Sequence, residues 1–160
     1  MKNLAYNREK SVEYATKWAT ARNPKYYSFD NLGGDCTNFI SQCIYAGCNI
    51  MNYSKDTGWY YNSLNDRAPA WTSVQFFYDF ITNNKGKGPF ASLALPSEIE
   101  IGDVIQLGRV NGQFYHAVLV TKIINGRFYV CSHTRDALNV PLSSYYYSQI
   151  RCLHVLGARK

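Results

Sequence analysis

Residues 30–48 read DNLGGDCTNFISQCIYAGC and contain three of the five cysteines of the chain. From Cys36 to Ala46, apolar side chains recur at intervals of three and four residues, which predicts a helix that begins at Cys36. Gly47 supplies the expected stop signal for this helix. Gly33-Gly34 allows a sharp backbone turn before the helix and leaves space for a substrate chain to approach.

Of the three cysteines, Cys36 has the position that favours a reactive thiol. The thiolate is the nucleophilic form, and the unpaired N–H groups at a helix N-terminus lower the pKa of a nearby cysteine. Cys43 lies two turns into the helix and Cys48 lies past its predicted end, so both are predicted to be small buried side chains. A carboxylate beside a thiolate raises its pKa, so Asp35 is expected to cap the helix or hold the loop.

Outside this segment, the pattern predicts helices first and strands afterwards. Asn125-Gly126, between two β-rich runs, is a strong hairpin signal. The polar, aromatic stretch 48–70 has no clear period and is predicted to be a long surface loop. The chain is therefore expected to be an α+β protein with N-terminal helices packed on an antiparallel sheet, forming a single catalytic domain over residues 1–160. The other predicted helices span 7–21 and 72–83, and the predicted strands span 99–107, 114–123, 127–134 and 150–156.

A cysteine nucleophile needs a base, and the chain has three histidines. His116 opens a predicted strand, which suits a base at the rim of a sheet. Pairing about the Asn125-Gly126 turn places His116 opposite residues 134–135, and a bulge or a looser turn would bring His133 beside it. His154, in the last apolar run, is expected to be structural or exposed to solvent.

Composition excludes several classes of protein. Five cysteines without a C-x-x-C pair predict neither a zinc site nor a complete disulfide framework, and no metal or cofactor is expected. The net charge of +6 favours anionic partners such as cell-wall polymers, but the basic residues are scattered and do not predict nucleic-acid binding. No apolar run of membrane-spanning length and no signal-peptide core occurs. A cell-wall or extracellular location would therefore require an exported or phage-encoded parent protein, and the cytoplasm is expected otherwise.

Aromatic residues are abundant, with 14 tyrosines and 8 phenylalanines. A tyrosine offers an apolar ring and a polar tip, which suits a wet binding cleft. Trp59, Tyr60, Tyr61 and Trp71 are candidates for the wall of a substrate groove, and the alternative is that they pack against the helices.

The chain also carries a series of segments in a recognisable order: GGDCTNF, GWYY, WTSV, GDVIQL, HAVLVT and SHT. This series resembles the putative amidase domain family of Gram-positive bacteria, over about residues 6–140. That family is grouped with the papain-like cysteine hydrolases, near the NlpC-type and CHAP cell-wall hydrolases. The resemblance implies a papain-like fold and hydrolysis of an amide through a thioester, without a cofactor.

The resemblance also implies roles for individual residues. Cys36 takes the place of the nucleophile and His116 that of the general base. His133 is the best occupant of the third position, which orients the base. Rivals for that position are Ser132, Thr134 and Asp136.

The oxyanion of such an enzyme is expected to bind the backbone N–H groups at the start of the Cys36 helix. A side chain from the preceding loop could add a donor, and Tyr27 and Asp30 are the candidates, with Asp35 shaping the site. The expected substrate is a peptide amide of peptidoglycan. Two alternatives remain open at this point: an acyl-transferring or deamidating effector that acts on a protein, and a catalytically silent module that binds the cell wall.

Overall fold

The computed structural model describes all 160 residues. It confirms the expected α+β class: four helices accompany a seven-stranded antiparallel sheet, in the order β1-β9-β5-β6-β7-β8, with β4 also paired to β9. The helices are α1 (Arg8–Trp18), α2 (Cys36–Cys48), α3 (Pro69–Thr72) and α4 (Val74–Asn83). The sheet strands are β1 (Asn3–Leu4), β4 (Gly88–Ala94), β5 (Val104–Gly108), β6 (Phe114–Ile124), β7 (Arg127–Ser132), β8 (Ala137–Pro141) and β9 (Gln149–Arg159).

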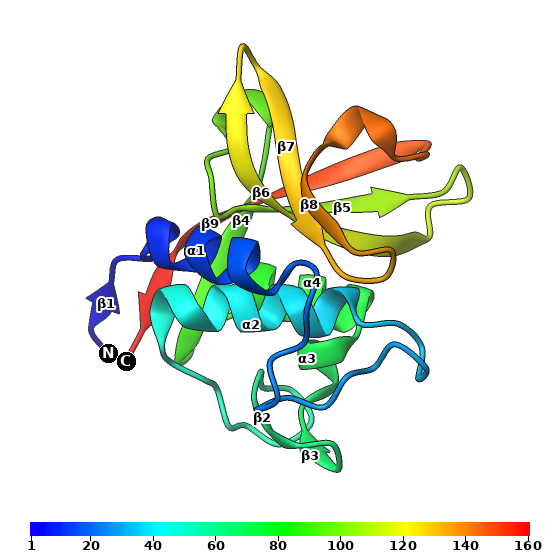
Figure 1. The fold of residues 1–160 in the computed structure, drawn as a ribbon. Helices are drawn as coiled ribbons and strands as arrows, with labels where there is room; N and C mark the ends of the chain where they lie inside the picture. The colour runs from blue at the N-terminus through cyan, green and yellow to red at the C-terminus, as the bar shows by residue number, and fades with distance from the viewer.

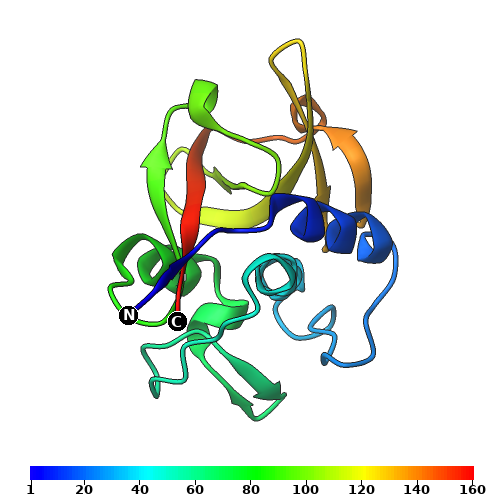
Figure 2. The ribbon, with the colours of Figure 1, turned by 90° about the vertical axis from the view of Figure 1, so that its left-hand side faces the viewer.

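Helices α1 and α2 lie side by side against the twisted sheet (Figures 1 and 2). Side chains alternate along β6, so its two faces pack against different groups of residues. Ala117 and Leu119 belong to the larger core, which includes the buried residues of α2. Val118 and Val120 belong to a smaller core between β5, β6, β7 and β9. The start of α2 is thereby fixed against β6.

The predicted helices are present, but their ends differ from the prediction. The first ends at Trp18 instead of residue 21, and the second continues through Gly47 to Cys48. Asn49 ends α2 instead, in the left-handed conformation, with its N–H bonded to the Tyr45 carbonyl. Gly47 lies inside the helix, and a Cβ there would lie 2.4 Å from a ring carbon of Tyr6, so only glycine fits at this position. This glycine permits close packing and does not stop the helix.

The third predicted helix is interrupted at Ser73, which has an extended backbone between α3 and α4. The Ser73 hydroxyl accepts the Phe76 N–H, so it caps α4. The stretch 48–70 is not wholly irregular, since it contains a short hairpin of β2 (Tyr61–Ser63) and β3 (Asp66–Arg67).

Strands β1, β4 and β8 were not predicted. β4 follows a Gly-rich segment and pairs with β9 along its whole length. The strand predicted over 99–107 begins only at Val104, because residues 100–103 form a turn closed by the Asp103 N–H and the Glu100 carbonyl.

The Asn125-Gly126 turn joins β6 and β7 as predicted, with positive φ at both residues. One extra residue on β6, between Val120 and Lys122, shifts the register by one position. Continued along the strands, this register puts His116 in line with Thr134. The bulge is therefore too small to put His133 directly opposite His116.

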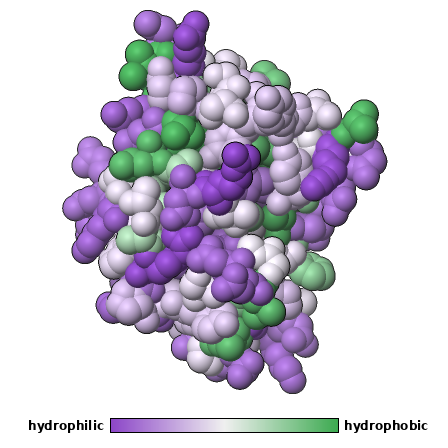
Figure 3. Space-filling view, turned by 45° about the vertical axis from the view of Figure 1, so that its right-hand side comes forward, coloured by the Kyte–Doolittle hydropathy of each residue, from purple (hydrophilic) through white to green (hydrophobic).

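The two ends of the chain pair with each other: the backbone groups of Lys2 and Lys160 exchange two hydrogen bonds. None of the helices is long and apolar enough to cross a membrane. Figure 3 shows one face of the molecule, on which hydrophobic residues lie in small groups among hydrophilic ones.

Candidate active site

Cys36 is the first residue of α2 and is 8% exposed. The backbone N–H groups of Ala117 and Thr37 face its sulfur and lower the pKa of the thiol. Burial is the larger effect, however, and the pKa is raised overall. The helix start therefore does not produce a resting thiolate, and Cys36 is a neutral thiol near pH 7.

The first turn of α2 also offers free donors. Asp35 is the N-cap residue, but its side chain makes no capping hydrogen bond. The first N–H groups of a helix have no partner within the helix, so those beside Cys36 are available to a ligand. This arrangement is suited to an oxyanion.

His116 is buried in β6, opposite Leu107 of β5, and it immediately precedes Ala117. Burial lowers the pKa of its imidazole to about 4, so the ring is neutral at pH 7. Its Nε2 atom is buried and has no hydrogen-bond partner. No hydrogen bond joins His116 to Cys36, but the neighbouring Ala117 N–H faces the Cys36 sulfur, so both residues border the same point of β6.

His133 follows β7 and is almost completely buried, stacked on Phe39 of α2 at 4.1 Å between ring centroids. Its Nδ1 lies 2.6 Å from Asp35 Oδ2, and its Nε2 lies 2.7 Å from the Trp18 carbonyl. Both ring nitrogens therefore face oxygen atoms, so the imidazole ring is held at both ends. Neither nitrogen is directed at His116, so the structure ties His133 to Asp35 and not to the predicted base.

Asp35 is buried beside Cys36 and accepts several hydrogen bonds. The Phe29 N–H donates to Oδ1 at 2.7 Å, and Asn38 Nδ2 donates to the same oxygen at 2.9 Å. Arg22 lies 3.8 Å from Oδ2, in addition to His133. Through these hydrogen bonds, Asp35 holds the 29–35 loop to α2 instead of capping the helix.

The other end of this loop is fixed by Thr134. Its hydroxyl accepts the Asp35 N–H at 2.9 Å, and a Cβ on Gly34 would lie 3.2 Å from the same oxygen. The space at Gly34 is therefore filled by the protein itself and not left for a substrate. Thr134 and Arg135 both have positive φ, which is costly for a β-branched residue such as threonine.

The remaining candidates differ in how far they are buried and in the contacts that they make. Asp30 is paired with Arg22 and accepts the Ser28 hydroxyl, and a carboxylate paired in this way offers no donor to an oxyanion. Tyr27 is half exposed, and its N–H donates to Tyr61. Trp59 and Trp71 are fully buried, and their indole N–H groups donate to Ser41 and Asn38 of α2.

Tyr60, next to Trp59, is half buried and contacts Tyr53 with the two rings tilted by 36°. Of the rivals for the third position, Ser132 shares a hydrogen bond with the Tyr145 hydroxyl, and Asp136 pairs with Arg22. Neither contacts His116 through a hydrogen bond.

A cavity of about 470 Å³ borders His116. Tyr145 lies beside the imidazole, with ring centroids 5.7 Å apart, and Thr134 and Arg135 form another part of the lining. Thr134 was among the expected rivals for the third position. Tyr145 and Arg135 were not identified from the sequence, because they come from the segment after β8 and from the β7–β8 turn, and β8 was not predicted. No group of three His, Cys, Asp or Glu side chains is arranged to hold a metal ion.

Comparison with known families adds a decisive observation. The model of the family described as "Putative amidase domain" matches residues 5–156, which is nearly the whole chain. The chain belongs to the putative amidase domain family. This family's description indicates hydrolysis of an amide, and both Cys36 and His116 lie inside the matched region.

Two curated relatives of this amidase domain come from Bacillus subtilis (strain 168), and both are described as uncharacterized. The protein YhbB is 31% identical over 118 residues, which cover 72% of the chain and 37% of that relative. The protein YjcM is 30% identical over 144 residues, which cover 85% of the chain and 32% of that relative. The chain thus spans about a third of the length of each. No solved structure matches it.

Proposed function

We propose that the chain is a cysteine-dependent amidase in which Cys36 is the nucleophile and His116 the general base. The observation that carries this proposal is the placement of Cys36 at the uncapped start of α2, with the N–H of Ala117, the residue after His116, facing its sulfur. A nucleophile, a titratable base and free backbone donors then border one point of β6.

The proposed reaction starts from a neutral pair, because burial raises the pKa of Cys36 and lowers that of His116. His116 accepts the thiol proton as the sulfur attacks the amide carbonyl, and the free N–H groups of α2 stabilise the oxyanion. His116 then donates that proton to the leaving amine, and a thioester forms. Water, deprotonated by His116, cleaves the thioester to a carboxylic acid and restores the thiol.

The unpartnered Nε2 of His116 supports its role as base, since a buried imidazole nitrogen without a partner is free to exchange a proton. Catalytic hydrogen bonds are often long or absent before substrate binds, so a rotation of the His116 side chain would complete the pair. In this proposal His133 acts through Asp35, by fixing the residue that precedes the nucleophile.

We also propose peptidoglycan peptides as the substrate. The net charge of +6 supports attraction to an anionic wall polymer. The motif series also resembles a family grouped near the NlpC-type and CHAP cell-wall hydrolases, and this resemblance supports the same substrate class.

Trapping of the acyl-enzyme tests the mechanism. The protein is incubated with purified peptidoglycan fragments, quenched in acid, and mapped by mass spectrometry for a hydroxylamine-sensitive adduct. We expect the adduct on Cys36 and an increase in free amino groups. Cys36→Ala is expected to lose at least about 1,000-fold in rate, because no other group replaces the nucleophile.

Cys48→Ala is the matched control, since Cys48 is the most exposed of the other cysteines and lies at the far end of the same helix. It is expected to keep full activity. Equal activity of the Cys36→Ala variant and the wild type would refute the cysteine mechanism. An adduct formed with a protein amide but not with wall fragments would refute the proposed substrate and leave the mechanism standing.

A further inference from the structure

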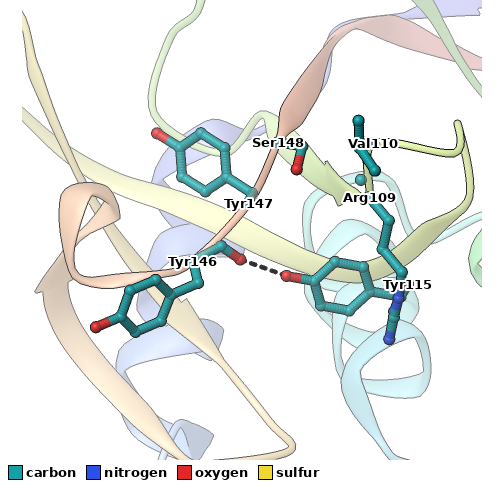
Figure 4. Close-up of a pocket in the computed structure, with 7 residues that line it drawn as sticks. Arg109, Val110, Tyr115, Tyr146, Tyr147 and Ser148 are labelled. Carbon is teal, nitrogen blue, oxygen red and sulfur yellow. Dashed lines mark hydrogen bonds between the residues drawn. The ribbon is translucent and has the colours of Figure 1, made fainter.

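A second cavity, of about 510 Å³, lies at the end of the β5–β6 hairpin (Figure 4). It is lined by Arg109 and Tyr115 of the hairpin and by residues 146–148. Tyr115 and Tyr146 also line the cavity that borders His116, so the two cavities adjoin. Leu107 pairs with His116, and Arg109 lies two residues further along, or roughly 7 Å at the usual rise of a strand.

The Arg109 guanidinium is held in place but has no anionic partner. Its carbon lies 4.3 Å from the centroid of the Tyr115 ring, a cation–π contact that Figure 4 shows as the side chain extending beside that ring. The Tyr115 hydroxyl donates to the Tyr146 carbonyl at 2.5 Å, which fixes the ring in turn. No hydrogen bond or ion pair uses the guanidinium N–H groups, so the whole donor fork is free.

The lining of the two cavities is cationic. It contains Arg109, Arg135 and several tyrosines, and it contains neither aspartate nor glutamate. An arginine with a free fork binds a carboxylate in a bidentate manner, and the Ser148 hydroxyl on the same cavity can add a further donor. Charge and donor geometry therefore favour an anionic group of the substrate at this place.

Resting on the proposed function, we infer that the Arg109 cavity is a substrate subsite that binds a free carboxylate of the peptide whose amide is cleaved beside His116. Arg109 supplies the charged fork, and the Tyr115 ring keeps that fork in place. The Trp59 and Trp71 side chains predicted to form the groove are in the core, and this tyrosine-lined surface takes their role.

Binding measurements on the Cys36→Ala protein test this inference without depending on turnover. The probes are a tetrapeptide of the peptidoglycan stem with a free C-terminal carboxylate and the same peptide capped as the carboxamide. We expect the uncapped peptide to bind about 5-fold or more tightly than the capped one, as a partly exposed charge-assisted pair allows. In this background, Arg109→Gln should abolish the difference, and Arg109→Lys should retain part of it.

Arg127→Gln is the matched control, because Arg127 is exposed at the start of β7, lines neither cavity and gives the same change in charge. It should preserve the preference for the uncapped peptide. Equal binding of the two peptides, or binding of neither, would overturn the inference. Failure of the cysteine mechanism would appear separately, as an absence of acyl-enzyme in the wild type. The binding result could still be interpreted in that case, because it does not depend on turnover.

Discussion

At the scale of single residues, burial decides the charge of the two proposed catalytic groups. Cys36 and His116 are both more than nine-tenths buried, and each is shifted towards its neutral form. A helix N-terminus favours the thiolate, but desolvation of the sulfur is the larger effect at this site. Under the proposed mechanism, the proton therefore leaves the thiol during the reaction, and activity depends on a base that stays neutral.

The lowered pKa of His116 predicts that the folded protein loses stability in acid. Its pKa is about 4 in the folded protein and 6.5 in a free side chain, so between these values the unfolded chain binds a proton that the native state does not. Stability is therefore lost as the pH falls through this window. At about 1.4 kcal/mol per pKa unit, the loss between pH 7.5 and 4.5 is roughly 2–3 kcal/mol from this residue.

Urea unfolding of the wild type and of His116→Gln at both pH values measures this contribution. The wild type should lose about 2–3 kcal/mol more than the variant, because the carboxylates contribute equally to both proteins. The same loss in both proteins would show that His116 titrates normally in the folded state.

Sequence patterns predicted the position of Cys36 in the fold well and the contacts of His133 poorly. Cys36 was singled out by its place at a helix start, which depends only on local periodicity. The contact of His133 with Asp35 joins residues 98 positions apart, and it follows from which side of β7 faces α2. The alternation of side chains along β7 indicates which of them face α2. The predicted contact between His133 and His116 depended instead on the size of a bulge, which the sequence does not indicate.

At the scale of elements, the junction of the 29–35 loop with α2 determines where Cys36, the proposed nucleophile, lies. Asp35 links this loop, α2 and His133 through buried hydrogen bonds, and Arg22 joins the same group from the segment after α1. The helix and the strands were predictable from their periods, because each period is local. β4 was not, because its pairing with β9 spans most of the C-terminal half of the chain.

Replacing Asp35 tests this junction. Asp35→Ala leaves the buried His133 Nδ1, Asn38 Nδ2 and the Phe29 N–H without their shared acceptor, which should cost about 3–5 kcal/mol of unfolding free energy. Asp35→Asn should cost clearly less, because its amide can accept from Phe29 and donate to a neutral His133.

Thermal and urea unfolding measure these costs, with Asp30→Ala as the control. Asp30 carries the same charge and also pairs with Arg22, but at the surface, so its loss should cost less than about 1 kcal/mol. Equal costs for the two alanine variants would show that the buried pair does not hold the junction.

At the scale of the whole molecule, Asp103 joins three distant parts of the chain. It is fully buried, pairs with Arg8 of α1 at 2.7 Å and with His154 of β9 at 2.7 Å, and accepts the Val155 N–H. Asp103 belongs to the GDVIQL segment of the motif series, and these contacts give it a structural role. His154 is part of this cluster, in agreement with the expectation that it is structural.

Asp103→Asn is expected to destabilise the protein by about 3 kcal/mol or more, because Arg8 loses its charged partner inside the fold. Glu100→Gln is the matched control, since Glu100 faces the same Arg8 and His154 but is exposed and lies 3.6–3.7 Å from them. It should change stability by less than about 1 kcal/mol. Urea unfolding at neutral pH compares them, and a similar small effect of both would show that the cluster is not essential to the fold.

The pairing of Lys2 with Lys160 brings the two ends of the chain to one place on the surface. Because the two ends lie together, any peptide that leads into this unit and any peptide that leads away from it would do so at one place. In Figure 1 that place is remote from the β5–β6 hairpin, which carries the Arg109 cavity. In a longer chain, such connections would therefore meet this unit away from that cavity and would leave the hairpin unobstructed.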